Sequence, residues 1–351
     1  MPFNPVSTRR SRREGVRPRS GFTRVELVGA LAIAAMIAAW MMVAGERARR
    51  TAMLGEDLSN LRQIATLTGQ YAADNDDRFW TFSWQGGETY NSKWLELNFA
   101  SDDMEAGANQ AVVMLRDSFG RPDMPKIEGW FVHLSYSHIP LMLYAGRSLP
   151  TRLFVSSGDQ PRRLWASDPE GFDQGKFGTN QPGKGGPYQR WPYSSSFRLS
   201  TSFYDQSATP QQRISQAGSD VGYTSPTGHD LRARLMASTS FPSQKIHLHD
   251  NYAWHFGTST KHNQPTFPLA EGYAFFGDDD ARLPLLFVDG HVAVHASKDS
   301  NPGWIPNEPT LCQPTTFASP SSGLSVPGRY RWTRGYLEGR DVGGPESPEC
   351  Q

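Results

Sequence analysis

Histidine and aspartate residues that could bind a metal ion occur at two places in the second half of the sequence. His247, His249 and Asp250 lie within four consecutive positions, and Asp289 and His291 follow later. Imidazole nitrogens and carboxylate oxygens are ligands in zinc and non-haem iron sites, so these residues suggest a metal-dependent hydrolase. The competing interpretation is an exposed strand, because residues at i and i+2 share one strand face and no short metal motif such as H-E-x-x-H occurs. We expect no metal and no cofactor.

A run of three acidic residues, Asp278 to Asp280, is a second candidate for cation binding. Its carboxylate oxygens suit calcium, but the run lacks the spaced ligands and the glycine of an EF-hand loop. This favours a solvent-exposed acidic turn. The chain also lacks G-x-S-x-G, P-loop and G-x-G-x-x-G motifs, and it offers no nucleophile with an identifiable base. We therefore expect a protein that is not an enzyme.

The two cysteines, Cys312 and Cys350, both lie near the C-terminus. Outside the cytoplasm they could form a disulfide, which would stabilise the fold by about 3–4 kcal/mol in the chain-entropy model. The alternative is two unpaired thiols in a tail. The sequence leaves both possibilities open.

The overall composition indicates a globular protein rich in loops. The chain has 351 residues, of which 37% are hydrophobic, and its 35 basic and 35 acidic residues balance. These values exclude a disordered chain and a protein with many membrane spans. The 33 glycines and 26 prolines exceed the usual share of about 12% and predict strands and turns rather than a helical bundle. A net charge of zero argues against nucleic acid as a partner.

Charge is nevertheless concentrated at the N-terminus. Residues 1–21 contain six arginines and one glutamate, and residues 27–44 form an 18-residue run without a charged side chain. Such a run is just long enough to cross a membrane as a helix. It is longer than the apolar region of a cleaved signal peptide and leads into charged sequence. A simple signal anchor remains an alternative.

The junction between these two segments has a distinctive sequence, SGFTRVE. Gly21 ends the basic leader, Phe22 follows, and Glu26 lies next to the apolar run. An acidic residue at a membrane boundary is costly unless it has a partner. The junction resembles that of type IV prepilins and type II secretion pseudopilins. The resemblance implies that a prepilin peptidase cuts after Gly21 and methylates Phe22, and that Glu26 pairs with the N-terminal amine of a neighbouring subunit during assembly.

Beyond residue 45 the sequence becomes amphipathic, with apolar residues at three- and four-residue spacing. No proline interrupts residues 22–74, so one helix is expected to end near Asp74 to Asp77. This stretch also resembles a bacterial prepilin-like family that carries a C-terminal H-x9-DG motif. The matching positions are Asn60, Leu61, Gln63, Ile64, Tyr71 and Asn75.

The end of that family motif is matched by LLFVDGHVAV, residues 285–294. Asp289, Gly290 and His291 fit the pattern, but the position of the motif histidine holds Asp279. The same segment predicts a β-hairpin with a type I′ turn at Asp289-Gly290. Further elements expected are strands at 153–156, 194–204 and 244–249 and a helix at 110–117.

Together these features predict an α+β fold of the pilin type, with a long N-terminal helix packed on an antiparallel-sheet head. The expected parts are a leader (1–21), the pilin-type helix (22–78, transmembrane at about 27–44), the head (79–299) and a Pro/Gly-rich tail (300–351). Loss of the leader removes six basic residues and one acidic residue and leaves a net charge of −5.

The expected function is that of a structural subunit of a pilus or a type II secretion pseudopilus. Its expected partners are prepilin peptidase, other pilin or pseudopilin subunits and the bacterial inner membrane, which it crosses once with the leader in the cytoplasm and the head outside. The alternatives are a membrane-anchored, extracytoplasmic metal-dependent hydrolase and a surface protein that binds a ligand. A pilus, a pseudopilus and an unassembled surface protein are not distinguished by the sequence.

Overall fold

The structure is a computed structural model. It describes residues 23–146, 149–174, 176, 193–206, 215–217, 223–225, 230–250, 254–255, 279–301, 316–318, 325–327, 330 and 337–343. The chain divides into two compact units, Met1–Arg49 and Arg50–Gln351. One helix, α1 (Arg24–Asp74), contributes residues to both units.

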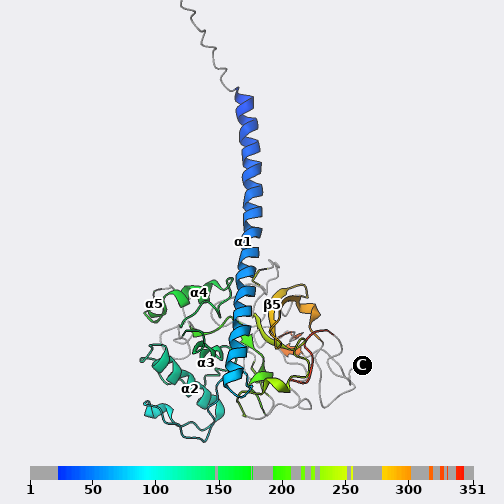
Figure 1. Ribbon diagram of the computed structural model, residues 1–351. Helices are drawn as coiled ribbons and strands as arrows, with labels where there is room; N and C mark the ends of the chain where they lie inside the picture. The colour runs from blue at the N-terminus through cyan, green and yellow to red at the C-terminus, as the bar shows by residue number, and fades with distance from the viewer. Residues whose placement is uncertain are drawn as a thin grey trace, which may run out of the picture. The chain divides into compact units, whose positions relative to one another are not determined.

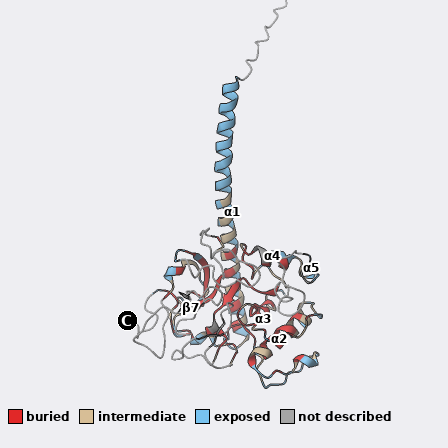
Figure 2. Cartoon of the chain, turned by 180° about the vertical axis from the view of Figure 1, so that it is seen from behind, coloured by how far each residue is buried: buried red, intermediate tan, exposed pale blue. Residues whose placement is uncertain are grey.

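Helix α1 is continuous over 51 residues, which confirms the long N-terminal helix expected from the sequence. Its end also lies where the acidic run predicted it, because Asp76 and Asp77 have φ angles of 53° and 58°. Left-handed backbone of this kind cannot continue a right-handed helix. Exposure changes along α1, from the exposed apolar residues of the first unit to a buried stripe in the second (Figure 2). The stripe consists of Asp57, Leu61, Ile64, Thr68 and Ala72.

The second unit contains short helices and a small sheet. In Figure 1, helices α2 to α5 lie on one side of the part of α1 that belongs to the second unit, and strand β5 lies on the other side. The helices are α2 (Asp103–Ser118), α3 (His138–Met142), α4 (Gln160–Ser167) and α5 (Pro169–Asp173), with 3-10 turns η1 (Leu95–Leu97), η3 (Thr201–Phe203), η4 (Met236–Ser238) and η5 (Ser297–Asp299). The helix predicted at 110–117 is therefore the second half of α2.

A four-stranded antiparallel sheet has the order β1-β4-β5-β6. Its strands are β1 (Phe197–Leu199), β4 (Ile246–Asp250), β5 (Arg282–Phe287) and β6 (Val292–Ala296). Two further antiparallel pairs are β2 (Ser215–Ala217) with β3 (Tyr223–Ser225), and β7 (Thr316–Ala318) with β8 (Ser325–Pro327). The described part of the chain is thus an α+β fold with a long N-terminal helix.

Strands β5 and β6 form the hairpin that the sequence predicted, but with a different turn. Leu286 pairs with Val292, and the N–H of Phe287 donates to the carbonyl of His291 at 3.0 Å. Gly290 has a φ of 87°, whereas Asp289 is not among the residues with positive φ. A type I′ turn needs positive φ at both positions, so that prediction was wrong. A three-residue loop that ends in left-handed glycine replaces it.

Two strand predictions need correction. Residues 153–156 form turns instead of a strand, because this backbone and its serines bind the buried part of α1: the N–H of Ser157 donates to Asp57 Oδ1 at 2.7 Å. In the segment 194–204 only the three residues of β1 are strand, and η3 follows. Residues 154–156, 194–200 and 202–204 are buried, which explains their apolar and small side chains without a longer strand.

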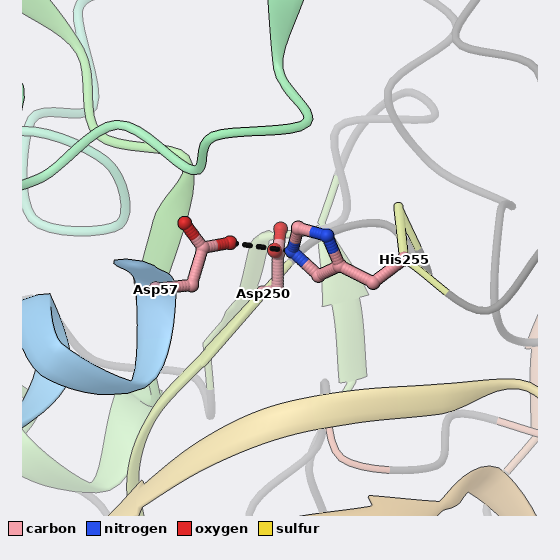
Figure 3. A group of neighbouring side chains, drawn as sticks. All are labelled: Asp57, Asp250 and His255. Carbon is pink, nitrogen blue, oxygen red and sulfur yellow. Dashed lines mark hydrogen bonds and ion pairs between the residues drawn. The ribbon is translucent and has the colours of Figure 1, made fainter. Parts of the chain in front are cut away.

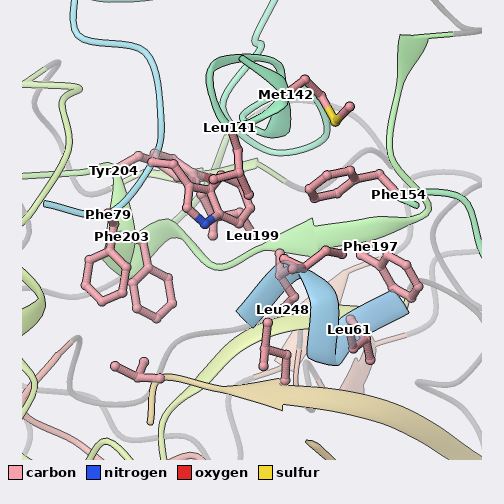
Figure 4. Packing of buried hydrophobic residues seen from close by; sticks show 14 of the residues in the cluster. Leu61, Phe79, Leu141, Met142, Phe154, Phe197, Leu199, Phe203, Tyr204 and Leu248 are labelled. Carbon is pink, nitrogen blue, oxygen red and sulfur yellow. The ribbon is translucent and has the colours of Figure 1, made fainter. Parts of the chain in front are cut away.

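The core of the second unit forms around the buried stripe of α1 (Figure 4). Leu61 and Ile64 pack in one cluster with Trp80, Phe154 and Leu248. Trp80 Nε1 donates a 2.7 Å hydrogen bond to Thr68 Oγ1, which satisfies a buried indole. The region 300–351 also contributes to the core, since its described residues Tyr330, Leu337 and Val342 are buried.

Candidate functional site

The N-terminal junction is described from Thr23 onward; Gly21 and Phe22 lie outside the described residues. Thr23 caps α1, because its N–H and its hydroxyl both donate to Glu26 Oε2 at 2.8 Å. In return, the N–H of Glu26 donates to Thr23 Oγ1 at 3.2 Å. This is the reciprocal capping box of the pattern T-x-x-E. The sequence thus carries a signal for this capping role in addition to the assembly role expected for Glu26.

Helix α1 is the one helix among the described residues that is long and apolar enough to cross a membrane. Within its first unit the apolar side chains are exposed, for example Trp40 at 81% and Val28 at 66%. Glu26, the acidic residue expected at the membrane boundary, is exposed and lies in the first turn of this apolar helix.

The structure does not bring His247 and His249 together with Asp250 as a metal site. His247 lies among the rings of Phe79, Trp80 and Phe203, at centroid distances of 5.1, 5.0 and 4.9 Å. Burial lowers the pKa of His247 to about 3, so the imidazole is neutral at physiological pH. His249 is also buried, and its Nδ1 lies 2.9 Å from the carbonyl oxygen of Asp250. The expectation that these histidines lie on an exposed strand was wrong.

Asp289 and His291 form a separate pair at the tip of the β5–β6 hairpin. His291 Nδ1 lies 2.6 Å from Asp289 Oδ1, and both side chains are partly exposed. The imidazole stacks on Phe287 with the ring planes 10° apart. These contacts stabilise the turn, and they give the motif residues a local structural role.

The acidic run 278–280 makes surface contacts in its described part, since Asp278 lies outside the described residues. Asp280 Oδ1 lies 2.6 Å from Lys298 Nζ, and both side chains are mostly exposed. The lysine lowers the pKa of this carboxyl by hydrogen bonding. Cys312 and Cys350 also lie outside the described residues.

A different group meets the geometric requirements of a metal site. Among the described residues, only Asp57, Asp250 and His255 form a group of three His, Asp or Glu ligands, and their ligand atoms lie within 4.8 Å of one another (Figure 3). Asp57 comes from α1, Asp250 ends β4, and His255 follows shortly after. All three are buried, with exposed fractions of 0%, 0% and 5%.

Hydrogen bonds orient these side chains. His255 Nε2 lies 2.6 Å from Asp57 Oδ2, and Ser156 Oγ donates to the same oxygen at 2.5 Å. Trp254 Nε1 donates to Asp250 Oδ1 at 2.9 Å. Outer contacts of this kind fix ligand orientation in metal sites.

Sequence reasoning missed two of these three residues, Asp57 and His255. The amphipathic pattern beyond residue 45 gives Asp57 the place of a polar residue between apolar positions of the helix. Its spacing to Leu61 and then to Ile64 and Thr68 instead continues the buried stripe. A charged residue within an apolar helical stripe was the available signal, because a buried carboxylate needs partners.

Comparisons with protein-family models, characterised proteins and solved structures gave no match to this chain. The described residues form an α+β fold, and among them one N-terminal apolar helix could cross a membrane.

Proposed function

We propose that this protein is a prepilin-like structural subunit, anchored by residues 27–44, cleaved after Gly21 and methylated at Phe22. The observation that supports the proposal is the two-part character of α1. One uninterrupted helix has an exposed apolar segment with Glu26 in its first turn and then a stripe buried in the head. Prepilin-like subunits need both parts, one for membrane storage and helix packing and one for holding the head.

The exposed apolar segment requires a nonpolar environment. Leu27, Ile33 and Met41 are each more than half exposed, as are most of their apolar neighbours. Burying a large apolar side chain contributes about 1.5–3 kcal/mol. A membrane supplies this before assembly, and helices of other subunits supply it afterwards. The proposed location is a bacterial inner membrane, with the head outside the cytoplasm.

The carboxylate of Glu26 is available for a contact with a neighbouring subunit. Its carboxylate is satisfied by Thr23 within its own helix, and the side chain is exposed. In a filament, the amine of a neighbouring subunit's Phe22 would offer a stronger, charge-assisted contact in a medium of low dielectric constant. The partners proposed are therefore prepilin peptidase and further pilin-like subunits.

The metal-dependent hydrolase receives less support. The histidines that suggested it are dispersed, and the group at Asp57, Asp250 and His255 is buried. A catalytic metal needs an open position for substrate or water.

The test is co-expression with an active prepilin peptidase, followed by N-terminal sequencing and intact mass measurement of the membrane-extracted protein. We expect a chain that begins at methylated Phe22. Gly21→Trp should retain the leader and still insert. Gly29→Trp is the matched control, because a Cβ at Gly29 meets nothing within 4 Å; it should be cleaved. An intact leader on the wild-type chain, while a known prepilin is processed in the same cells, would refute the proposal.

A further inference from the structure

The buried group Asp57, Asp250 and His255 places two carboxylates and one imidazole at a single point in the core. Isolated charges are very costly in such a place, and native proteins pair them or coordinate a metal with them. A divalent cation bound by a neutral histidine would carry the charge that matches the two carboxylates.

We propose that Asp57, Asp250 and His255 bind a divalent transition-metal ion of the Zn²⁺ type. The ion would join α1 to the end of β4 and to the residues that follow it. One nitrogen and two oxygen ligands suit Zn²⁺, Fe²⁺ or Mn²⁺ better than Ca²⁺ or Mg²⁺, which prefer oxygen alone. The role is structural, because all three ligands are buried.

The ligand atoms lie near enough to one another for one ion to gather them. Ligand bonds to zinc are about 2.0–2.2 Å, so two ligand atoms of a tetrahedral site lie roughly 3.4 Å apart. The three ligand atoms lie within 4.8 Å of one another, so the side chains would shift by about an ångström as the ion binds. The contact of 2.6 Å between His255 Nε2 and Asp57 Oδ2 is a hydrogen bond, which the ion would open as it replaces the shared proton.

Neighbouring N–H groups donate hydrogen bonds to both carboxylates. The N–H of Ser157 binds Asp57 Oδ1, while Asp57 Oδ2 faces the histidine. Trp254 Nε1 binds Asp250 Oδ1. Ser156 Oγ donates to Asp57 Oδ2. Each acidic ligand thus has an N–H donor that fixes its orientation.

The hairpin pair Asp289 and His291 provides a natural contrast. Its nitrogen and oxygen are also 2.6 Å apart, but both side chains are partly exposed, and no third ligand joins them among the described residues. A histidine–aspartate contact therefore needs neither burial nor a second carboxylate. The buried group has both.

The experiment uses the full chain in detergent, without a histidine tag, stripped with a chelator and then reloaded with Zn²⁺. We expect one equivalent of Zn²⁺ per chain after gel filtration and a rise in the unfolding temperature on the order of 5 °C. Asp250→Asn should bind at least about a hundredfold more weakly, because one charged ligand is lost. The control His291→Gln should bind like the wild type. Wild-type chain without stoichiometric Zn²⁺, or equal losses in both variants, would overturn the proposal.

A second variant identifies the ligand directly, even if Asp250→Asn fails to fold. His255→Cys places a thiolate, itself a metal ligand, at the site. Loaded with Co²⁺, it should show a sulfur-to-cobalt charge-transfer band that the wild type lacks. If His255 has only a packing role, the Co²⁺ spectra of the two proteins will be identical, and the proposal fails.

Discussion

Lys245 Nζ and Asp341 Oδ1 lie 2.9 Å apart in a position closed to solvent, with side-chain exposures of 0% and 5%. The other oxygen of Asp341 accepts a 2.8 Å hydrogen bond from the N–H of Ile246, the first residue of β4. The pair therefore attaches a C-terminal segment to the central sheet. Its energetic value depends on both partners, since a buried charge without its counterion is strongly unfavourable.

Asp341→Asn should therefore lower the free energy of unfolding by about 3–5 kcal/mol. The lysine would remain buried with a weaker partner. Urea unfolding followed by tryptophan fluorescence measures the change. Asp280→Asn is the matched control, because its ion pair with Lys298 is mostly exposed, and it should leave the unfolding midpoint unchanged. Similar losses in both variants would contradict the structure.

Gly107 in α2 should not tolerate a side chain. A Cβ there would lie 2.8 Å from His133 Nε2 and 3.3 Å from Val132 Cγ2, so Gly107→Ala should destabilise the head by about 1–3 kcal/mol through overpacking. Gly69→Ala in α1 is the control. Its Cβ meets nothing within 4 Å, and the change should stabilise the helix by about 0.5–1 kcal/mol. Thermal unfolding of the two variants should shift in opposite directions.

Stability should fall as the pH decreases from about 6.5 toward 3. Burial lowers the pKa of His133, His138 and His247 to about 3, so the folded chain keeps them neutral while the unfolded chain protonates them near pH 6.5. The unfolded state therefore binds more protons in this range, and each histidine contributes a loss of about 1.4 kcal/mol per pH unit.

His247→Leu tests this dependence. It removes the one proton that the unfolded chain takes up at this position, and should reduce the slope of unfolding free energy against pH by about 1.4 kcal/mol per pH unit well below pH 6.5. Urea unfolding at pH 7, 6 and 5 gives the slope. An unchanged slope would show that His247 is protonated in the folded protein.

Substitutions at Glu26 should separate helix capping from assembly. Glu26→Gln retains a residue that can complete the capping box with Thr23 but removes the charge. We expect it to be processed and inserted like the wild type and to assemble poorly. Glu26→Ala should show the same assembly defect and also weaken the first turn. Sedimentation of sheared filaments or pseudopili against membrane-bound subunit gives the measurement; normal assembly of Glu26→Gln would contradict the proposed pairing.

Local patterns predicted the parts of the fold that depend on local physics. Helix α1 was predicted from the apolar run and from the apolar stripe that includes Leu61 and Ile64, and its end was predicted from the acidic residues that follow. The β5–β6 hairpin was predicted from the Asp-Gly pair. The conformation of that turn was not predictable from the dipeptide alone, because the pairing register determined that only Gly290 takes positive φ.

The buried group could not be predicted in the same way. Asp57 and His255 are 198 positions apart, and no local pattern connects them. The alternation of β4 correctly indicated a strand, but it could not show that both faces are covered. His247 and His249 are therefore buried rather than exposed.

The position of α1 in the core has a mechanical consequence for the head. Its stripe from Asp57 to Ala72 is surrounded by the core, and Thr68 is hydrogen-bonded to Trp80. A pull along the axis of this segment must shear side chains out of a packed interior over several helical turns at once, rather than peel a surface contact residue by residue. The head should therefore resist tension up to the force that unfolds it and then yield in a single step.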